Sequence, residues 1–188
     1  DLTGIEGMLP PGQRVSTSEL VNAILSQPIA ERSVATVVHE AVHQLAYNSG
    51  LQTRLADNPV AISEGLAMFF ESPDLSGSNG WNGIGKINRY NLQIFKQYLA
   101  QRPSDSLLTL IRDDKRFQSS DSVTAAYGES WALVYYLIKT KPKEFCRYLQ
   151  SLAAQPPLGP TDAKRRQQEF LEQINVDPVK LDRDFLRY

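Results

Sequence analysis

Residues 34–48, VATVVHEAVHQLAYN, carry both histidines of the chain, His39 and His43, four positions apart with Glu40 between them. Asn48 and Gly50 are residues that often end a helix. We therefore predict a core helix over residues 29–47, with the two histidines at the border of a buried stripe. The apolar residues of that stripe recur at helical spacing: Val34, Val38, Ala41, Val42 and Leu45.

The two histidines form the pattern H-E-x-x-H, which is typical of a zinc site on a helix. Side chains at positions i and i+4 project from one helical face with Cβ atoms roughly 5–6 Å apart, so both imidazoles can reach one metal ion. Glu40 lies beside that face, where it can accept a proton from a metal-activated water. The ordinary alternative is a pair of hydrogen-bonded histidines on a helix that binds no metal.

A catalytic zinc ion usually has three protein ligands, so a third ligand is needed outside this helix. The chain has no further histidine and only one cysteine, which leaves a carboxylate. Glu64 follows His43 after 20 intervening residues, near the start of a helix predicted over residues 59–71. Glu71 lies further along the same face and is the competing ligand, although a solvated glutamate at a helix end is the more typical interpretation.

The order H-E-x-x-H, about twenty residues and then E-G-L-A resembles the gluzincin metallopeptidases, the group that contains thermolysin and the membrane alanyl aminopeptidases. This resemblance implies that His39, His43 and Glu64 bind zinc and that Glu40 is the general base. The segments HEAVHQLAYNSG and SEGLAMFFE more closely resemble uncharacterised bacterial gluzincin-like domains.

Residues 126–133, AYGESWAL, extend the resemblance. In the aminopeptidase branch a tyrosine some sixty residues after the glutamate ligand stabilises the oxyanion, and Tyr127 occupies the similar position. A phenol aimed at developing negative charge is a suitable donor. The alternative is that Tyr127 packs at the start of an apolar helix, because Ser130 stands where the aminopeptidases have glycine. Their upstream Gly-Ala-Met-Glu-Asn segment, which binds the substrate amino terminus, has no equivalent in residues 1–32.

These observations lead us to expect a zinc metallopeptidase, in which Glu40 takes a proton from a metal-activated water that attacks a peptide carbonyl. The alternative function is a catalytically inactive gluzincin-like domain that binds a partner or a peptide in the same cleft. The expected fold is mainly α, a helical zinc-binding domain that resembles the catalytic half of thermolysin-like peptidases.

Composition indicates one globular domain over residues 1–188, because 41% hydrophobic and 22% charged residues permit a sizeable core. The formal net charge of -1 implies no nucleic-acid partner, and the longest apolar run, residues 131–138, is too short to span a membrane. A peptide or protein substrate is the expected partner, and the oligomeric state stays open. Because Asp1 is not an initiator methionine, we expect a fragment of a longer protein. We further expect a bacterial protein that is exported to the periplasm or outside the cell.

The other segments also have helical patterns, and no segment shows the period-two alternation of a strand. Lys164, Arg165 and Arg166 form a charge run that is more typical of a solvated helix face than of a binding patch. A loop rich in glycine and serine is expected at residues 72–85. Further helices are expected at residues 16–25, 86–102, 106–112, 121–139 and 143–153, in the segment that contains the charge run, and from residue 177 onward.

Overall fold

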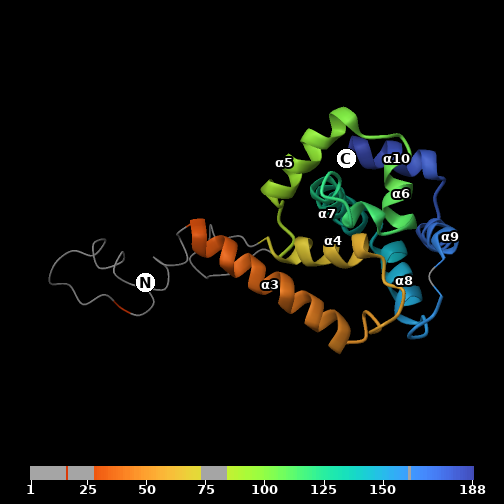
Figure 1. Ribbon diagram of the computed structural model, residues 1–188, viewed down its shortest axis with the longest axis horizontal. Helices are drawn as coiled ribbons and strands as arrows, with labels where there is room; N and C mark the ends of the chain where they lie inside the picture. The colour runs from red at the N-terminus through yellow and green to blue at the C-terminus, as the bar shows by residue number, and fades with distance from the viewer. Residues whose placement is uncertain (1–15, 17–27, 73–83, 161) are drawn as a thin grey trace.

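Figure 1 shows a computed structural model of the protein, which describes residues 16, 28–72, 84–160 and 162–188. The regular secondary structure in these ranges is helical, and none of these residues lies in a β-strand. The expectation of a mainly α fold is therefore confirmed. The helix predicted at residues 16–25 and most of the loop predicted at residues 72–85 lie outside the described residues.

The helices of the described ranges lie at positions close to those predicted. None of them is long and apolar enough to cross a membrane. Their order along the chain is α3 Pro28–Asn48, α4 Val60–Phe70, α5 Arg89–Tyr98, the 3-10 turn η1 Leu99–Gln101, α6 Ser106–Arg112, the 3-10 turn η2 Lys115–Phe117, α7 Val123–Thr140, α8 Pro142–Ala153, α9 Ala163–Ile174 and α10 Pro178–Arg187.

The helix predicted at residues 86–102 is shorter in the structure because α5 has its own amino-terminal cap. The Oδ1 atom of Asn88 accepts a hydrogen bond from the backbone N–H of Asn91 at 3.1 Å, which satisfies one of the free donors of the first helical turn. At the other end the chain tightens into η1 before Pro103.

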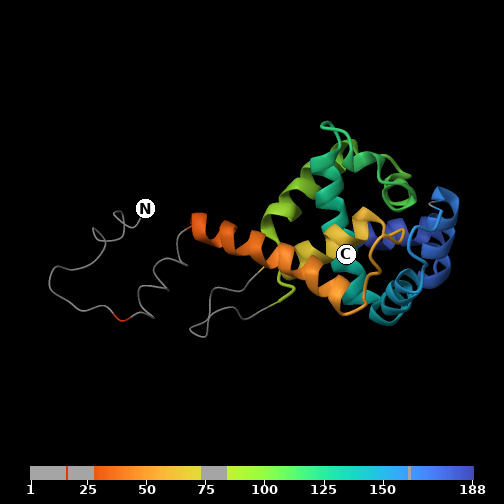
Figure 2. The same ribbon diagram turned by 60° about the horizontal axis from the view of Figure 1, so that its bottom comes forward.

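Helix α7 lies at the centre of the helical cluster and packs against α4 and α5 (Figures 1 and 2). Its residues Leu133 and Leu137 are fully buried in the core. Gly65 lets α4 approach α7 closely, because a Cβ atom at that position would lie 2.5 Å from Cγ2 of Val134 and 2.6 Å from the carbonyl oxygen of Ser130. The position of α4, which carries Glu64, therefore depends on a residue without a side chain.

Helix α3 lies along one side of the cluster, packed on α4, and its amino-terminal end extends beyond the other described helices (Figures 1 and 2). The predicted buried stripe is wrong for Ala41, which is exposed, and for Leu45, which is 66% exposed. Because α3 packs mainly on one helix, only a narrow face is covered. That face includes the buried Ala46 and the half-buried His39 and His43.

Arg166 corrects the prediction of a solvated charge run, since its side chain is buried between Asp57 and Asp114. Its Nε atom donates to Asp57 at 2.8 Å and its Nη1 atom donates to Asp114 at 2.9 Å. The second oxygen of Asp114 accepts the backbone N–H of Val60 at 3.0 Å. This ion-pair cluster thus holds a carboxylate at the amino terminus of α4, where free N–H groups and the helix dipole favour negative charge.

Candidate metal centre

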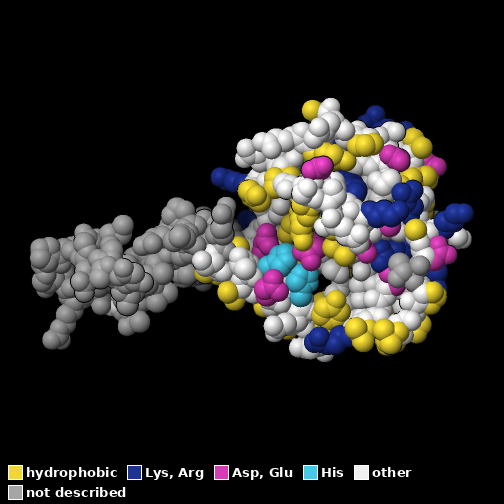
Figure 3. All heavy atoms as spheres, in the orientation of Figure 1, with side chains coloured by type: hydrophobic (Ala, Val, Ile, Leu, Met, Phe, Trp, Pro, Cys, Tyr) yellow, Lys and Arg dark blue, Asp and Glu magenta, His cyan; other side chains and the backbone are white. Residues whose placement is uncertain are grey.

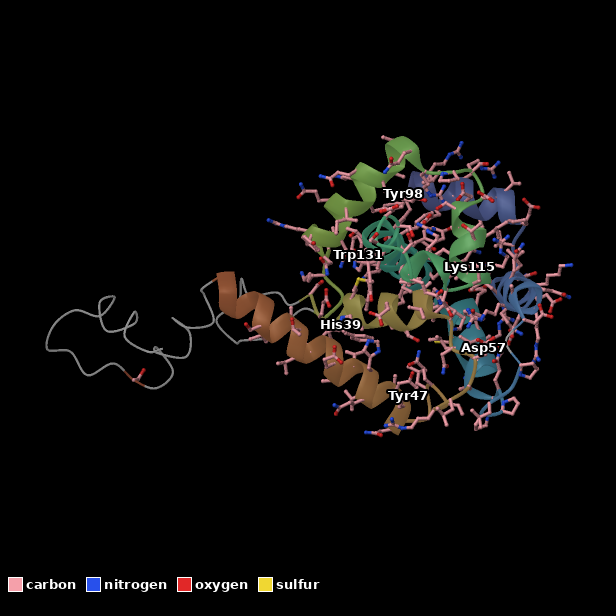
Figure 4. All side chains as sticks on the ribbon, viewed as in Figure 1. His39, Tyr47, Asp57, Tyr98, Lys115 and Trp131 are labelled. Atoms are coloured by element: carbon pink, nitrogen blue, oxygen red, sulfur yellow. The ribbon has the colours of Figure 1, made fainter. Side chains whose placement is uncertain are left out.

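The structure brings together the three predicted ligand residues where α3 crosses α4, at the position labelled His39 in Figure 4. The Nε2 atoms of His39 and His43 are 3.2 Å apart. One carboxylate oxygen of Glu64 is 3.2 Å from Nε2 of His39, and the other is 3.4 Å from Nε2 of His43. Side chains from two successive turns of α3 and from one position of α4 thus meet at one place.

The separations fit a zinc ion. Zinc bonds of about 2.0–2.2 Å in a tetrahedron place neighbouring ligand atoms about 3.3–3.6 Å apart. The distance between the two Nε2 atoms is 3.2 Å, and those from each Nε2 atom to its nearer Glu64 oxygen are 3.2 and 3.4 Å, which is close to that range. No other His, Cys, Asp or Glu among the described residues joins this group. Three protein ligands with an open fourth position are typical of a catalytic zinc site, whereas structural zinc sites are closed.

Glu71 is neither a solvated glutamate nor a member of the ligand group. Its Oε2 atom accepts a hydrogen bond from Nδ1 of His39 at 2.7 Å, and its side chain is only 18% exposed. The Nδ1 donor fixes the tautomer in which Nε2 of His39 faces the metal position. The solvated interpretation of Glu71 is therefore wrong, because the crossing of α3 over α4 covers this carboxylate.

Asn88 extends this chain of hydrogen bonds to α5. Its Nδ2 atom donates to Oε1 of Glu71 at 2.8 Å, while its Oδ1 atom caps α5. Both oxygens of Glu71 therefore have a partner. The sequence contains a signal for Glu71, because Glu71 lies on the same helical face as Glu64. It contains no signal that pairs Asn88 with Glu71, because that contact depends on how α5 is placed relative to α4.

The charges of the metal centre are strongly coupled. Hydrogen bonds to Glu64 and Glu71 raise the pKa of His39 from its ordinary 6.5 to about 10. Burial acts to raise the pKa of Glu64, but hydrogen bonds from His39 and His43 outweigh it and lower this pKa to about 2. Without a metal, His39 and Glu64 therefore form an ion pair at neutral pH, and a metal ion must displace a proton from His39 to bind there.

The two residues expected to take part in the chemistry lie on different helices and differ in exposure. Glu40 follows His39 on α3 and its side chain is exposed. Tyr127 is half-buried on α7, with its ring edge-on to Phe117 at a centroid distance of 5.4 Å. Burial and, to a smaller extent, the charge of Glu64 raise the pKa of Tyr127, so its hydroxyl keeps its proton and remains a donor.

Tyr127 and His39 line the same cavity, which has a volume of about 260 Å³ between α4, α5 and α7. Glu71 also lines it. Figure 3 shows the histidine side chains at the molecular surface with acidic side chains on both sides. The candidate metal centre is thus accessible from solvent and adjoins a cavity large enough for part of a ligand.

A family model described as "Protein of unknown function (DUF1570)" matches residues 33–159. The matched range includes α3 from its second turn onward, α4, α5 and α7, and with them every residue of the metal centre. No curated protein and no solved structure matches the chain.

Proposed function

The chain belongs to the DUF1570 family, whose description gives no function, and we propose that it is a zinc-dependent peptidase of the gluzincin type. One observation carries this proposal. The Nε2 atoms of His39 and His43 are 3.2 Å apart, and each has one carboxylate oxygen of Glu64 beside it, at 3.2 and 3.4 Å, separations close to those between the ligand atoms of a tetrahedral zinc ion. Two imidazoles and one carboxylate with a fourth position open are a ligand set of zinc peptidases.

Glu40 is the proposed general base. A zinc ion in the centre would polarise the scissile carbonyl and lower the pKa of a water molecule at the open position to about 7. Glu40 takes one proton from the attacking water and passes it to the amine that leaves. In the whole reaction a C–O bond forms, the peptide C–N bond breaks, and water supplies the atoms for a new carboxyl group and a new amine.

Tyr127 is the proposed donor to the oxyanion that develops on the carbonyl oxygen. Its place in the cavity beside His39 supports this role, as does the raised pKa that keeps its hydroxyl protonated. Glu71 holds His39 in orientation through the 2.7 Å hydrogen bond to Nδ1 and has no part in proton transfer to the substrate.

A second candidate function is a catalytically inactive domain that binds a peptide or partner in the same cleft. The observation that favours it is the exposure of Glu40, which does not line the cavity. A general base needs to lie within hydrogen-bond reach of its proton donor, although such contacts often tighten only in the complex with substrate.

The deciding experiment combines zinc analysis with peptide hydrolysis. The zinc-loaded protein is incubated with a mixture of unstructured peptides, and new amino termini are quantified by mass spectrometry. Glu40→Gln should abolish cleavage while zinc content stays at one ion per chain, because glutamine keeps the shape but cannot take the proton. Glu172→Gln, the same change at an exposed glutamate of α9, is the matched control. Cleavage by Glu40→Gln equal to wild type would overturn the catalytic role, and no cleavage by wild type would favour the binding domain.

A further inference from the structure

The cavity beside His39 has a composition that predicts which side chains it accepts. Met68 of α4 and Ile94 of α5 provide apolar walls, and the rings of Tyr90 and Tyr127 provide aromatic ones. Tyr90 is 65% exposed, so its ring is available to a ligand. Apolar and aromatic walls with a few polar groups are typical of small-ligand sites.

Charge also limits what this cavity can bind. Among the described residues that line the cavity, Glu71 is the one carboxylate, and none is a lysine or an arginine. Both oxygens of Glu71 are already hydrogen-bonded, to His39 and Asn88. With a divalent ion bound, the charge of +2 and the two carboxylates of Glu64 and Glu71 sum to zero. An ionised ligand side chain would thus give up part of its hydration without gaining a countercharge.

Size excludes the smallest residues as good ligands. A volume of about 260 Å³ corresponds to roughly eight or nine water molecules at about 30 Å³ each. A glycine or alanine residue would leave much of this space filled with water, whereas a phenylalanine, tyrosine or leucine side chain would fill it and bury apolar surface against Met68 and Ile94. Met68 has a flexible side chain that can adjust to either an aromatic or an aliphatic group.

We propose that this cavity is a specificity pocket for a large uncharged side chain, aromatic or long aliphatic, on the residue that binds next to the metal centre. The proposal rests on the proposed function for the position of the metal. The pocket adds the substrate class to that function, namely peptides with a large uncharged residue beside the bond that is cleaved.

Amino-acid hydroxamates test the pocket without requiring catalysis, because the hydroxamate group binds zinc and the side chain varies. Their dissociation constants with the zinc-loaded protein are measured by calorimetry. Phenylalanine and leucine hydroxamates should bind roughly 10- to 100-fold more tightly than glycine hydroxamate, from the apolar surface that they bury. Aspartate and lysine hydroxamates should bind no better than the glycine compound. Equal affinities across the series, or a preference for a charged side chain, would overturn the pocket.

A variant tests the location of the pocket. Thr124 is an exposed lining residue on the first turn of α7, and Thr124→Arg places a cation at the cavity. It should tighten binding of glutamate hydroxamate about two- to fivefold, the size of an exposed ion pair, and weaken binding of lysine hydroxamate. Thr140→Arg makes the same change at the exposed far end of α7 and should change neither. If both variants behave alike, the side chain does not bind in this cavity.

The outcomes separate the pocket from the peptidase. Side-chain selectivity without peptide cleavage would support the pocket and reject catalysis, which leaves the binding domain. Cleavage without side-chain selectivity would support the peptidase and reject the pocket. If no hydroxamate binds, acetohydroxamate included, the metal centre itself is wrong and both proposals fall.

Discussion

Glu71→Gln is expected to weaken zinc binding without removing a ligand. The Glu71 carboxylate accepts from Nδ1 of His39 at 2.7 Å, a short charge-assisted contact, and from Asn88 at 2.8 Å. Partners of this kind typically change metal affinity 10- to 100-fold, or about 1.4–2.7 kcal/mol. Glutamine keeps one acceptor oxygen for His39 but loses the charge and one of the two acceptors. We therefore expect the lower end of this range, about tenfold.

The assay is competition for zinc against a chelator of known affinity at fixed pH. Glu172→Gln on α9 serves as the control and should bind zinc like wild type. Glu64→Gln should weaken binding more than Glu71→Gln does, because it alters a ligand. If Glu71→Gln has no effect, the hydrogen bond to His39 does not support the metal centre. If it weakens binding as much as Glu64→Gln, Glu71 is itself a ligand and the assigned ligand set is wrong.

Three further predictions concern the oxyanion donor, pH and packing. Tyr127→Phe should lower peptide turnover on the order of 10²- to 10³-fold with zinc content unchanged, as measured by steady-state kinetics; full activity would exclude the oxyanion role. In the metal-free protein the pKa of His39 is raised from 6.5 to about 10. Protonated His39 therefore stabilises the folded state fully below pH 6.5, and this contribution to the free energy of unfolding is lost as pH rises toward 10. Urea unfolding should show this decline in wild type, and a His39→Gln variant should show a smaller one; equal declines would contradict it. Gly65→Ala should lower the free energy of unfolding by about 1–3 kcal/mol, since the new Cβ meets Val134 and Ser130 at 2.5 and 2.6 Å; an unchanged urea midpoint would show that α4 and α7 can separate at little cost.

The sequence by itself was sufficient for the helices and for the local part of the candidate metal centre. The i, i+4 spacing of His39 and His43 places them on one face of any helix, whatever surrounds it. Apolar periodicity and proline positions likewise located the helices of the described chain closely, because both act over a few residues. The sequence could also single out Glu64, which the structure places beside His39 and His43, because few other ligand types were available in the chain.

Only the tertiary structure decided which residues meet between helices. The partner of Glu71, the burial of Arg166 and the exposure of Leu45 all depend on how α3, α4 and α9 pack. A helical pattern indicates which face of a helix is apolar or polar, but it does not indicate which other element covers that face. The hydrogen bond from Asn88 to Glu71 joins residues 17 positions apart across a change of chain direction. Such contacts depend on how all the helices of the core pack together, and the spacing of residues within one segment carries no information on that packing.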